Sequence, residues 1–164
     1  MAGGRRLDER QLVVEQLLQF LDIDSNTQKL GHDLWDVLAP HMEPVLDGFY
    51  RRVQRAGIEP RLSDATVARL KKMQKAHWGS LLGAQFDQSY IERVGRIGIR
   101  HRDAGLDLGW YVAAYLALKA EFRNVIVQST RPTATKGLLI KTLDQYVAFD
   151  MALAVSTYSA AIVD

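Results

Sequence analysis

One histidine, His101, has a type and a position that together suggest chemistry. On the helix predicted over residues 88–103 it lies one turn after Ile97 and two turns after Val94, within an apolar stripe. Because the pKa of an imidazole is close to neutral pH, a histidine that faces a core needs a partner. A backbone carbonyl is the common partner, and a metal ion is the alternative.

Two glycines, Gly95 and Gly98, precede this histidine on the same predicted helix. Each costs about 0.5 to 1 kcal/mol of helix stability relative to alanine. We expect them to permit the close approach of another helix or of a flat ligand.

The motifs of common metal sites and enzymes are missing from the sequence. The other histidines, His32, His41 and His77, form no pair at the i, i+4 spacing of a helical zinc site. There is no cysteine and no G-x-S-x-G nucleophile motif, and the glycines around His101 lack the preceding strand of a nucleotide-binding loop. We therefore predict no catalytic residue, and we expect His32, His41 and His77 to lie at the surface, at helix contacts or at a pocket edge.

Helices account for the whole pattern of apolar residues, which recur at helical spacing between glycine and proline breakers. The pattern predicts an all-α protein with helices over residues 8–20, 26–39, 43–56, 64–82, 88–103, 108–129 and 134–163. In an all-α domain, one imidazole on a helix face is an arrangement that holds haem iron from one side.

The composition limits the possible classes of protein. The chain has 164 residues, of which 48% are hydrophobic, and a formal net charge of +2. One domain with a sizeable core is expected, and the scattered basic residues do not indicate nucleic-acid binding. The absence of cysteine excludes disulfides and covalent haem attachment through C-x-x-C-H. No signal peptide or membrane span is recognisable, so we expect a cytoplasmic protein with no membrane partner.

A longer stretch around the histidine carries a family resemblance. RIGIRHRDAGLDLGWYVAAY, residues 96–115, resembles the helix F to helix G segment of the globin-coupled sensors. That segment has a histidine, a glycine four residues later and a Trp-Tyr pair nine and ten residues later, which His101, Gly105, Trp110 and Tyr111 match. VLDGFYRRV resembles helix B of the family and ATVARLKKMQKAHWGSLL resembles helix E, and the similarity runs from about residue 15 to the C-terminus.

The resemblance implies a globin fold of the three-over-three type. It adds an N-terminal pre-A helix and leaves helix D absent or minimal. We accordingly expect a disordered N-terminus over residues 1–7 and a single sensor globin domain over residues 8–164. Within that domain, residues 8–22 would form the pre-A extension and residues 23–164 the globin core.

The resemblance also implies a non-covalent haem b. His101 matches the proximal ligand of the iron, and Tyr50 matches the distal tyrosine that hydrogen-bonds the gas. Leu70 and Met73 match the distal helix E positions, where Met73 replaces the small polar residue of some members. Val45, Phe49 and Ile97 would line the haem, and Trp110 and Tyr111 would lie near it and relay proximal movement.

The distal residues predict a preference among gases. Bound dioxygen draws charge from ferrous iron, so a phenol beside it makes a hydrogen bond worth about 1.5 to 3 kcal/mol. Carbon monoxide draws much less charge. Tyr50 would therefore raise oxygen affinity by a factor of about 10 to 100.

The implied function is a haem-based oxygen sensor of a bacterial-type signal transducer, with CO and NO as further haem ligands. Signals would pass through a homodimer interface of helices G and H to an output module, such as a diguanylate cyclase or a histidine kinase. This chain itself would not be an enzyme. Two alternatives remain open: a haem enzyme of the nitric oxide dioxygenase or peroxidase type, and a haem-free interaction module with a globin fold.

Overall fold

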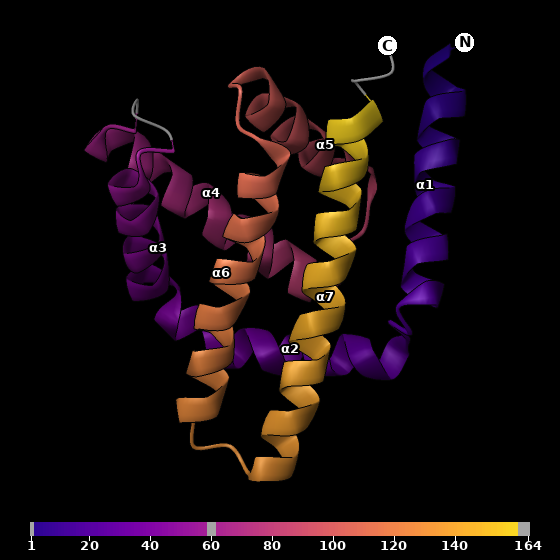
Figure 1. Cartoon of the computed structure of the whole chain (residues 1–164). Helices are drawn as coiled ribbons and strands as arrows, with labels where there is room; N and C mark the ends of the chain where they lie inside the picture. Colours follow the sequence, from indigo (N-terminus) through magenta and orange to yellow (C-terminus); the bar gives the residue numbers. More distant parts are fainter. Residues whose placement is uncertain (1, 59–61, 161–164) are drawn as a thin grey trace.

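The computed structural model describes residues 2–58 and 62–160, with side chains described over 11–58 and 62–156. The described part of the chain is all-helical, as the sequence predicts (Figure 1). Its elements are α1 (Ala2–Phe20), α2 (Ser25–Leu38), a 3-10 turn η1 (Ala39–His41), α3 (Met42–Ala56), α4 (Asp64–Leu82), α5 (Gln88–Asp103), α6 (Leu108–Gln128) and α7 (Thr133–Ala160).

Most helices begin where a short polar side chain can cap them. The carboxylates of Asp24 and Asp87 accept from backbone N–H groups three residues later, at 2.9 Å in both cases, and begin α2 and α5. Ser63 does the same for α4, and Asp107 accepts from the Gly109 N–H at 2.8 Å to begin α6. Each cap satisfies a backbone donor that the first helical turn leaves without a partner.

One difference from the predicted elements lies at the N-terminus. Helix α1 begins at Ala2, so it includes most of the segment expected to be disordered. Residues 5–10 include no glycine or proline that would end the helix. The helix also includes Gly3 and Gly4, which precede them. Residue 1 and residues 161–163, the end of the last predicted helix, lie outside the described residues. Between α3 and α4, the described residues 57–58 and 62–63 are not helical.

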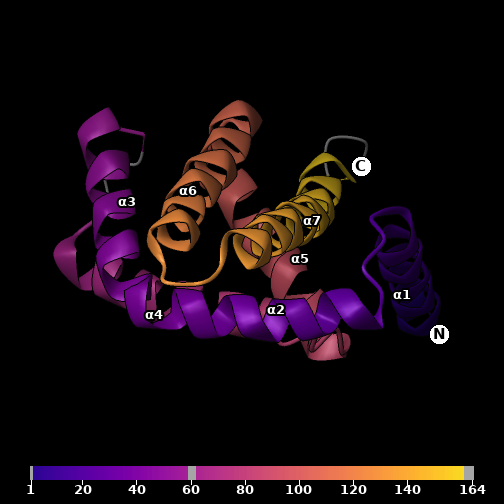
Figure 2. The same ribbon diagram turned by 90° about the horizontal axis from the view of Figure 1, so that it is seen from below.

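The helices are arranged around α7. Helices α6 and α7 run side by side in opposite directions, and α2 crosses beneath both of them (Figures 1 and 2). Helix α7 also packs along α5, and α1 lies against α5 and α7 on the outside. Helix α3 packs on α4 and α6. Among the described residues, α4 and α5 do not pack extensively on each other, although both contact α7.

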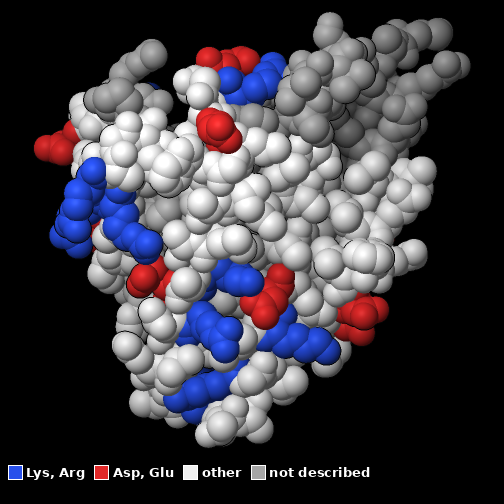
Figure 3. Space-filling model, viewed as in Figure 1, with Lys and Arg blue, Asp and Glu red and all other residues white. Residues whose placement is uncertain are grey.

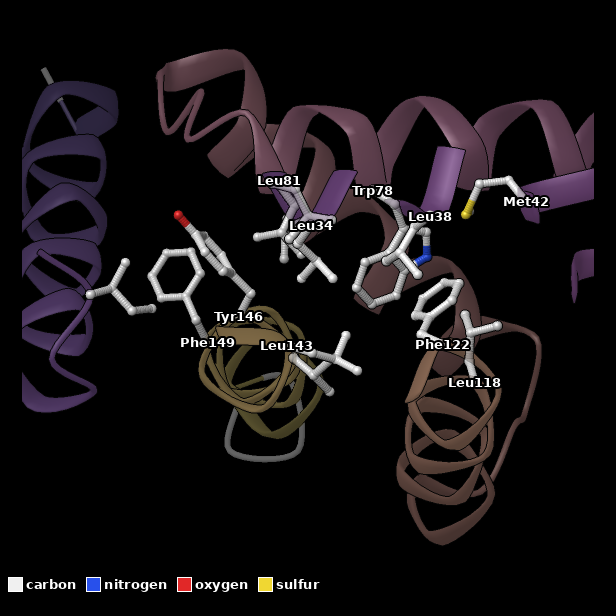
Figure 4. Close-up of a cluster of buried hydrophobic side chains, with 14 of the residues drawn as sticks. Leu34, Leu38, Met42, Trp78, Leu81, Leu118, Phe122, Leu143, Tyr146 and Phe149 are labelled. Carbon is white, nitrogen blue, oxygen red and sulfur yellow. The ribbon is translucent and has the colours of Figure 1, made fainter. Parts of the chain in front are cut away.

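The main core lies where α2, α4, α6 and α7 meet. Figure 4 shows the side chains of Leu34 and Leu38, Trp78, Phe122 and Leu143 converging from these four helices. All five are buried, and the ring of Trp78 meets that of Phe122 edge-on at 5.1 Å. This packing fixes α4, α6 and α7 relative to one another and leaves α5 to be held mainly by α7.

Close approach of α2 depends on a glycine. A Cβ atom at Gly31 would lie 2.9 Å from the Leu82 carbonyl oxygen and 3.0 Å from the ring of Tyr146. A larger residue would therefore push α2 away from α4 and α7.

The face that shows α6 and α7 is largely uncharged in its middle part, whereas basic side chains, with acidic ones among them, gather toward its lower end (Figure 3). Exposed large apolar residues on these two helices are Trp110, Leu116, Val127 and Leu138. None of the described helices combines the length and the apolar character that a membrane span requires.

Candidate functional site

His101 lies in the last turn of α5 and is half-buried. Its Nδ1–H donates to the Ile97 carbonyl at 2.7 Å, which leaves Nε2 as the nitrogen with the lone pair in the neutral ring. Among the described residues, Nε2 has no hydrogen-bond partner. Burial lowers the pKa of His101, and the Ile97 hydrogen bond opposes this only in part. The imidazole is thus a neutral base with one nitrogen held and the other open.

The turn after His101 explains why a glycine follows four residues later. Helix α5 ends in a reversal in which the Leu106 N–H donates to the His101 carbonyl at 3.0 Å. Gly105 adopts a positive φ of 78° within this reversal, a conformation that costs little only for glycine. The glycine four residues after the histidine therefore ends the helix just beyond it.

Tyr111, from the first turn of α6, lies against the imidazole. The two ring centroids are 4.7 Å apart at an interplanar angle of 37°, and Tyr111 is only 5% exposed. The ring of Tyr115, one turn further along α6, meets Tyr111 edge-on at 5.3 Å. Trp110, the other half of the Trp-Tyr pair, is 52% exposed and lies on a different side of α6.

Tyr50 forms a second group with side chains of α3 and α4. It is 6% exposed, and Phe49 packs edge-on against it with centroids 5.1 Å apart. Burial raises the pKa of Tyr50, and a hydrogen bond with the Gln74 side chain partly opposes this. The Gln74 Oε1 also accepts from the Trp78 Nε1–H at 3.0 Å. Tyr50 is therefore a buried, protonated phenol close to Gln74 of α4.

The remaining predicted site residues divide by exposure. Val45 and Phe49 on α3, Leu70 on α4 and Ile97 on α5 are half-buried, and Met73 is 43% exposed. Within the described part of the chain, no hydrogen bond or ring contact joins the His101 group to the Tyr50 group. The structure thus forms two separate groups, on α5 and α6 and on α3 and α4.

Gln74 was not predicted from the sequence, although Leu70 and Met73 on the same helix were. Gln74 is one helical turn after Leu70, so the i, i+4 spacing from that residue was the signal that could have found it. Met73 stays a predicted distal residue.

The other histidines behave as packing or surface residues. His32 and His41 are exposed. His77 is buried in a contact between α4 and α7, where its Nε2 lies 2.9 Å from Asp150 Oδ1. Its Nδ1 is buried with no hydrogen-bond partner among the described residues.

A metal at this site would depend on a cofactor. The described residues contain no group of three or more His, Asp, Glu or Cys side chains that could hold a metal ion. A metal bound to the open nitrogen of His101 would have one protein ligand on that side, and a cofactor would have to supply the others.

The arrangement of these helices is a globin fold, and comparisons with known proteins agree. The chain belongs to the protoglobin family, whose sequence model matches residues 11–162. No curated protein matches it.

Two solved globin domains are similar in structure. The chain resembles the globin domain of a Geobacter sulfurreducens globin-coupled sensor with a TM-score of 0.75 at 15% identity, over 88% of this chain and 96% of that one. It also resembles the ferrous globin domain of Escherichia coli DosC with a TM-score of 0.70 at 18% identity, over 93% and 99% of the two chains. These likenesses establish the fold.

Proposed function

We propose that this chain is a haem-binding gas-sensor domain with His101 as the proximal ligand. The observation that carries the proposal is the state of the His101 ring, which is neutral, held through Nδ1 by the Ile97 carbonyl at 2.7 Å and open at Nε2. A histidine that binds a metal through one nitrogen commonly donates its other N–H to a carbonyl, which fixes the ring.

The predicted pocket residues have the character that a haem requires. A flat apolar cofactor needs half-buried apolar side chains, and Val45, Phe49, Leu70 and Ile97, from three helices, are half-buried. Helices α4 and α5 both contact α7 without extensive packing on each other, which supports a cofactor between them. When bound, haem supplies a ferrous iron with one position open to a diatomic gas.

Tyr50 is proposed to select dioxygen. Its raised pKa keeps the hydroxyl protonated, so it donates a hydrogen bond to a gas ligand that carries partial negative charge. Gln74 of α4 lies close to the phenol, and its Oε1 accepts from Trp78 Nε1–H at 3.0 Å. Met73, more exposed than the others, would lie toward the edge of the pocket.

Signalling is proposed to pass through a homodimer of α6 and α7. The largely uncharged middle of this face and the exposed apolar residues of α6, Trp110 and Leu116, support an interface there (Figure 3). Leu116→Glu should shift the sedimentation of the protein to that of a monomer. Leu12→Glu on α1, which also replaces an exposed leucine, should leave the dimer intact.

In this proposal the chain is a sensor of a cytoplasmic signalling protein, and catalysis belongs to an output module such as a diguanylate cyclase or a histidine kinase. The resemblance to globin-coupled sensors supports this role, and no side chain of the site is assigned a reaction.

Absorption spectra test the proposal directly. The purified protein, loaded with haemin and then reduced and exposed to oxygen, should show a Soret band and a stable oxygenated form. His101→Ala should lose haemin or its oxygenated spectrum, whereas His32→Ala, which removes an exposed histidine, should match the wild type. A wild-type protein that takes up no haemin would refute the proposal.

A further inference from the structure

A buried carboxylate joins four helices on the far side of Tyr115 from the proposed site. Asp150 of α7 is 0% exposed. Its Oδ1 accepts from the Tyr90 hydroxyl of α5 at 2.6 Å, and its Oδ2 accepts from the Tyr115 hydroxyl of α6 at 2.7 Å. The His77 Nε2 of α4 lies 2.9 and 3.0 Å from the two oxygens.

These hydrogen bonds balance the cost of burying the charge. Burial alone would raise the pKa of Asp150, but the interaction with His77 and the hydrogen bonds from His77, Tyr90 and Tyr115 together lower it. Burial and the nearby carboxylate raise the pKa of Tyr90 and of Tyr115 well above the ordinary value, so both phenols keep the protons they donate. If its partners moved, the buried carboxylate would lose both its hydrogen bonds and the compensation for its missing hydration. These four side chains therefore favour one arrangement.

Two routes lead from Asp150 to His101. Along α6, the Tyr115 ring contacts Tyr111 edge-on at 5.3 Å, and Tyr111 contacts the imidazole at 4.7 Å. Along α5, Tyr90 ties the first turn of the helix that carries His101 to α7. The same carboxylate therefore fixes both the ring behind His101 and the helix that presents it.

We infer that Asp150 is a positioning residue for the proximal ligand, acting on His101 through Tyr115 and Tyr111 and through Tyr90. The inference rests on the proposed function, in which the open nitrogen of His101 binds haem. Asp150 itself touches neither the imidazole nor the proposed haem pocket, and its action is transmitted by packing.

A core without this charge would hold the same helices. Replacing a buried ionic cluster by apolar residues of similar volume is often neutral or stabilising, so stability alone does not account for the carboxylate. Directional hydrogen bonds to both oxygens restrict how α5 and α6 sit on α7, which apolar contacts do less strictly.

The test compares two tyrosine variants, of which only one removes a hydrogen bond to Asp150. Tyr115→Phe removes a hydroxyl that donates to Asp150, whereas Tyr146→Phe removes a buried hydroxyl with no hydrogen-bond partner among the described residues. Asp150→Asn keeps the shape and offers one acceptor oxygen in place of two. If Asp150→Asn fails to fold, the tyrosine pair still decides the question.

Two readouts are measured on each variant. The first is the rate at which haemin transfers from the loaded protein to excess apomyoglobin, which reports how well His101 is held. The second is amide hydrogen exchange over residues 94–105 relative to residues 30–38 of α2, measured on the protein without haemin. Exchange needs no bound haem, so it tests positioning even if the proposed function is wrong.

Tyr115→Phe should speed haemin loss about tenfold and lower the protection of residues 94–105 selectively, because a hydrogen bond to a charged group is lost. Tyr146→Phe should change either readout by less than about twofold. Equal effects of the two variants, an equal loss of protection in α2, or unprotected residues 94–105 in the wild type would overturn the inference. Absence of haemin binding in the wild type, with selective deprotection retained, would refute the proposed function and leave the positioning of α5 standing.

Discussion

At the end of α5, His101 is half-buried and keeps an open nitrogen, whereas in the middle of α4 a nitrogen of His77 faces both oxygens of Asp150. Both residues lie on helices that contact α7, and both are in contact with a tyrosine ring. They differ in the partner that fixes the ring. A carbonyl of its own helix orients His101 and leaves it able to bind a ligand, whereas a carboxylate of another helix commits His77 to the core. For these two histidines, the residue type therefore says less about the role than the helix that supplies the hydrogen-bond partner of the ring.

Removing each imidazole separates these roles most strongly. His77→Ala should lower the free energy of unfolding by about 3 to 5 kcal/mol, because it takes a partner from a buried carboxylate. His101→Ala should lower it by about 1 kcal/mol or less in the haem-free protein, since a half-buried ring loses one local hydrogen bond. Urea unfolding of both variants without haemin measures the difference, and similar losses would contradict the contrast between the two histidines.

The Tyr50 group should respond in ligand affinity more than in stability. Tyr50→Phe should weaken oxygen binding by a factor of about 10 to 100 and leave carbon monoxide binding nearly unchanged, because the phenol donates to the more polar ligand. Oxygen and carbon monoxide dissociation rates measure this ratio. Tyr146→Phe serves as the control, and equal weakening for both gases would remove the assigned role of the hydroxyl.

Acid should reduce the contribution of the Asp150 cluster to folding stability more than it affects the contacts of His101. The pKa of Asp150 lies below its ordinary value of 3.8, so its contribution to stability is complete above that value and is lost as the pH falls through the lower folded-state pKa. The groups that face it are His77, Tyr90 and Tyr115. Below pH 4, the free energy of unfolding of Asp150→Asn should therefore fall less steeply with decreasing pH than that of the wild type. The two slopes should differ by at most about 1.4 kcal/mol per pH unit. Urea unfolding at a series of pH values measures both slopes, and parallel slopes would show that this carboxyl titrates alike in the folded and unfolded chains.

Substitutions at two glycines should change stability in opposite directions. Gly105→Ala should destabilise the protein by about 1 to 2 kcal/mol, because alanine must adopt the positive φ that ends α5. Gly137→Ala on α7 should stabilise it by about 0.4 to 1 kcal/mol, since a Cβ there meets no neighbour. Thermal unfolding resolves both changes. A neutral Gly105→Ala would mean that the turn after His101 rearranges freely.

Much of the fold could be predicted because its signals are local. The caps Asp24, Ser63, Asp87 and Asp107 lie within a few residues of the helix starts that they fix. The stripe around His101 likewise needs only helical periodicity. The predicted globin fold is confirmed on this basis and by the family match.

The Asp150 cluster could not be predicted, because its partners are far apart in sequence. His77 and Asp150 are separated by 73 residues, and Tyr90 and Asp150 by 60. An aspartate between apolar residues near the middle of α7 carries no local sign of being buried. Gln74 was missed for a different reason: the family resemblance names Leu70 and Met73 on this helix, and one residue further along a helix turns the side chain by about 100°.

The position of His101 at the end of its helix also affects how it can move. A ligand group in the middle of a helix shifts only if the helix bends or slides as a whole. His101 is followed four residues later by Gly105 and seven residues later by the start of α6 at Leu108. Changes of φ and ψ in this short segment would move the last turn of α5 without breaking the hydrogen bonds of its earlier turns. Tyr90 and Asp150 tie the start of this helix to α7, whereas His101 lies at its other end.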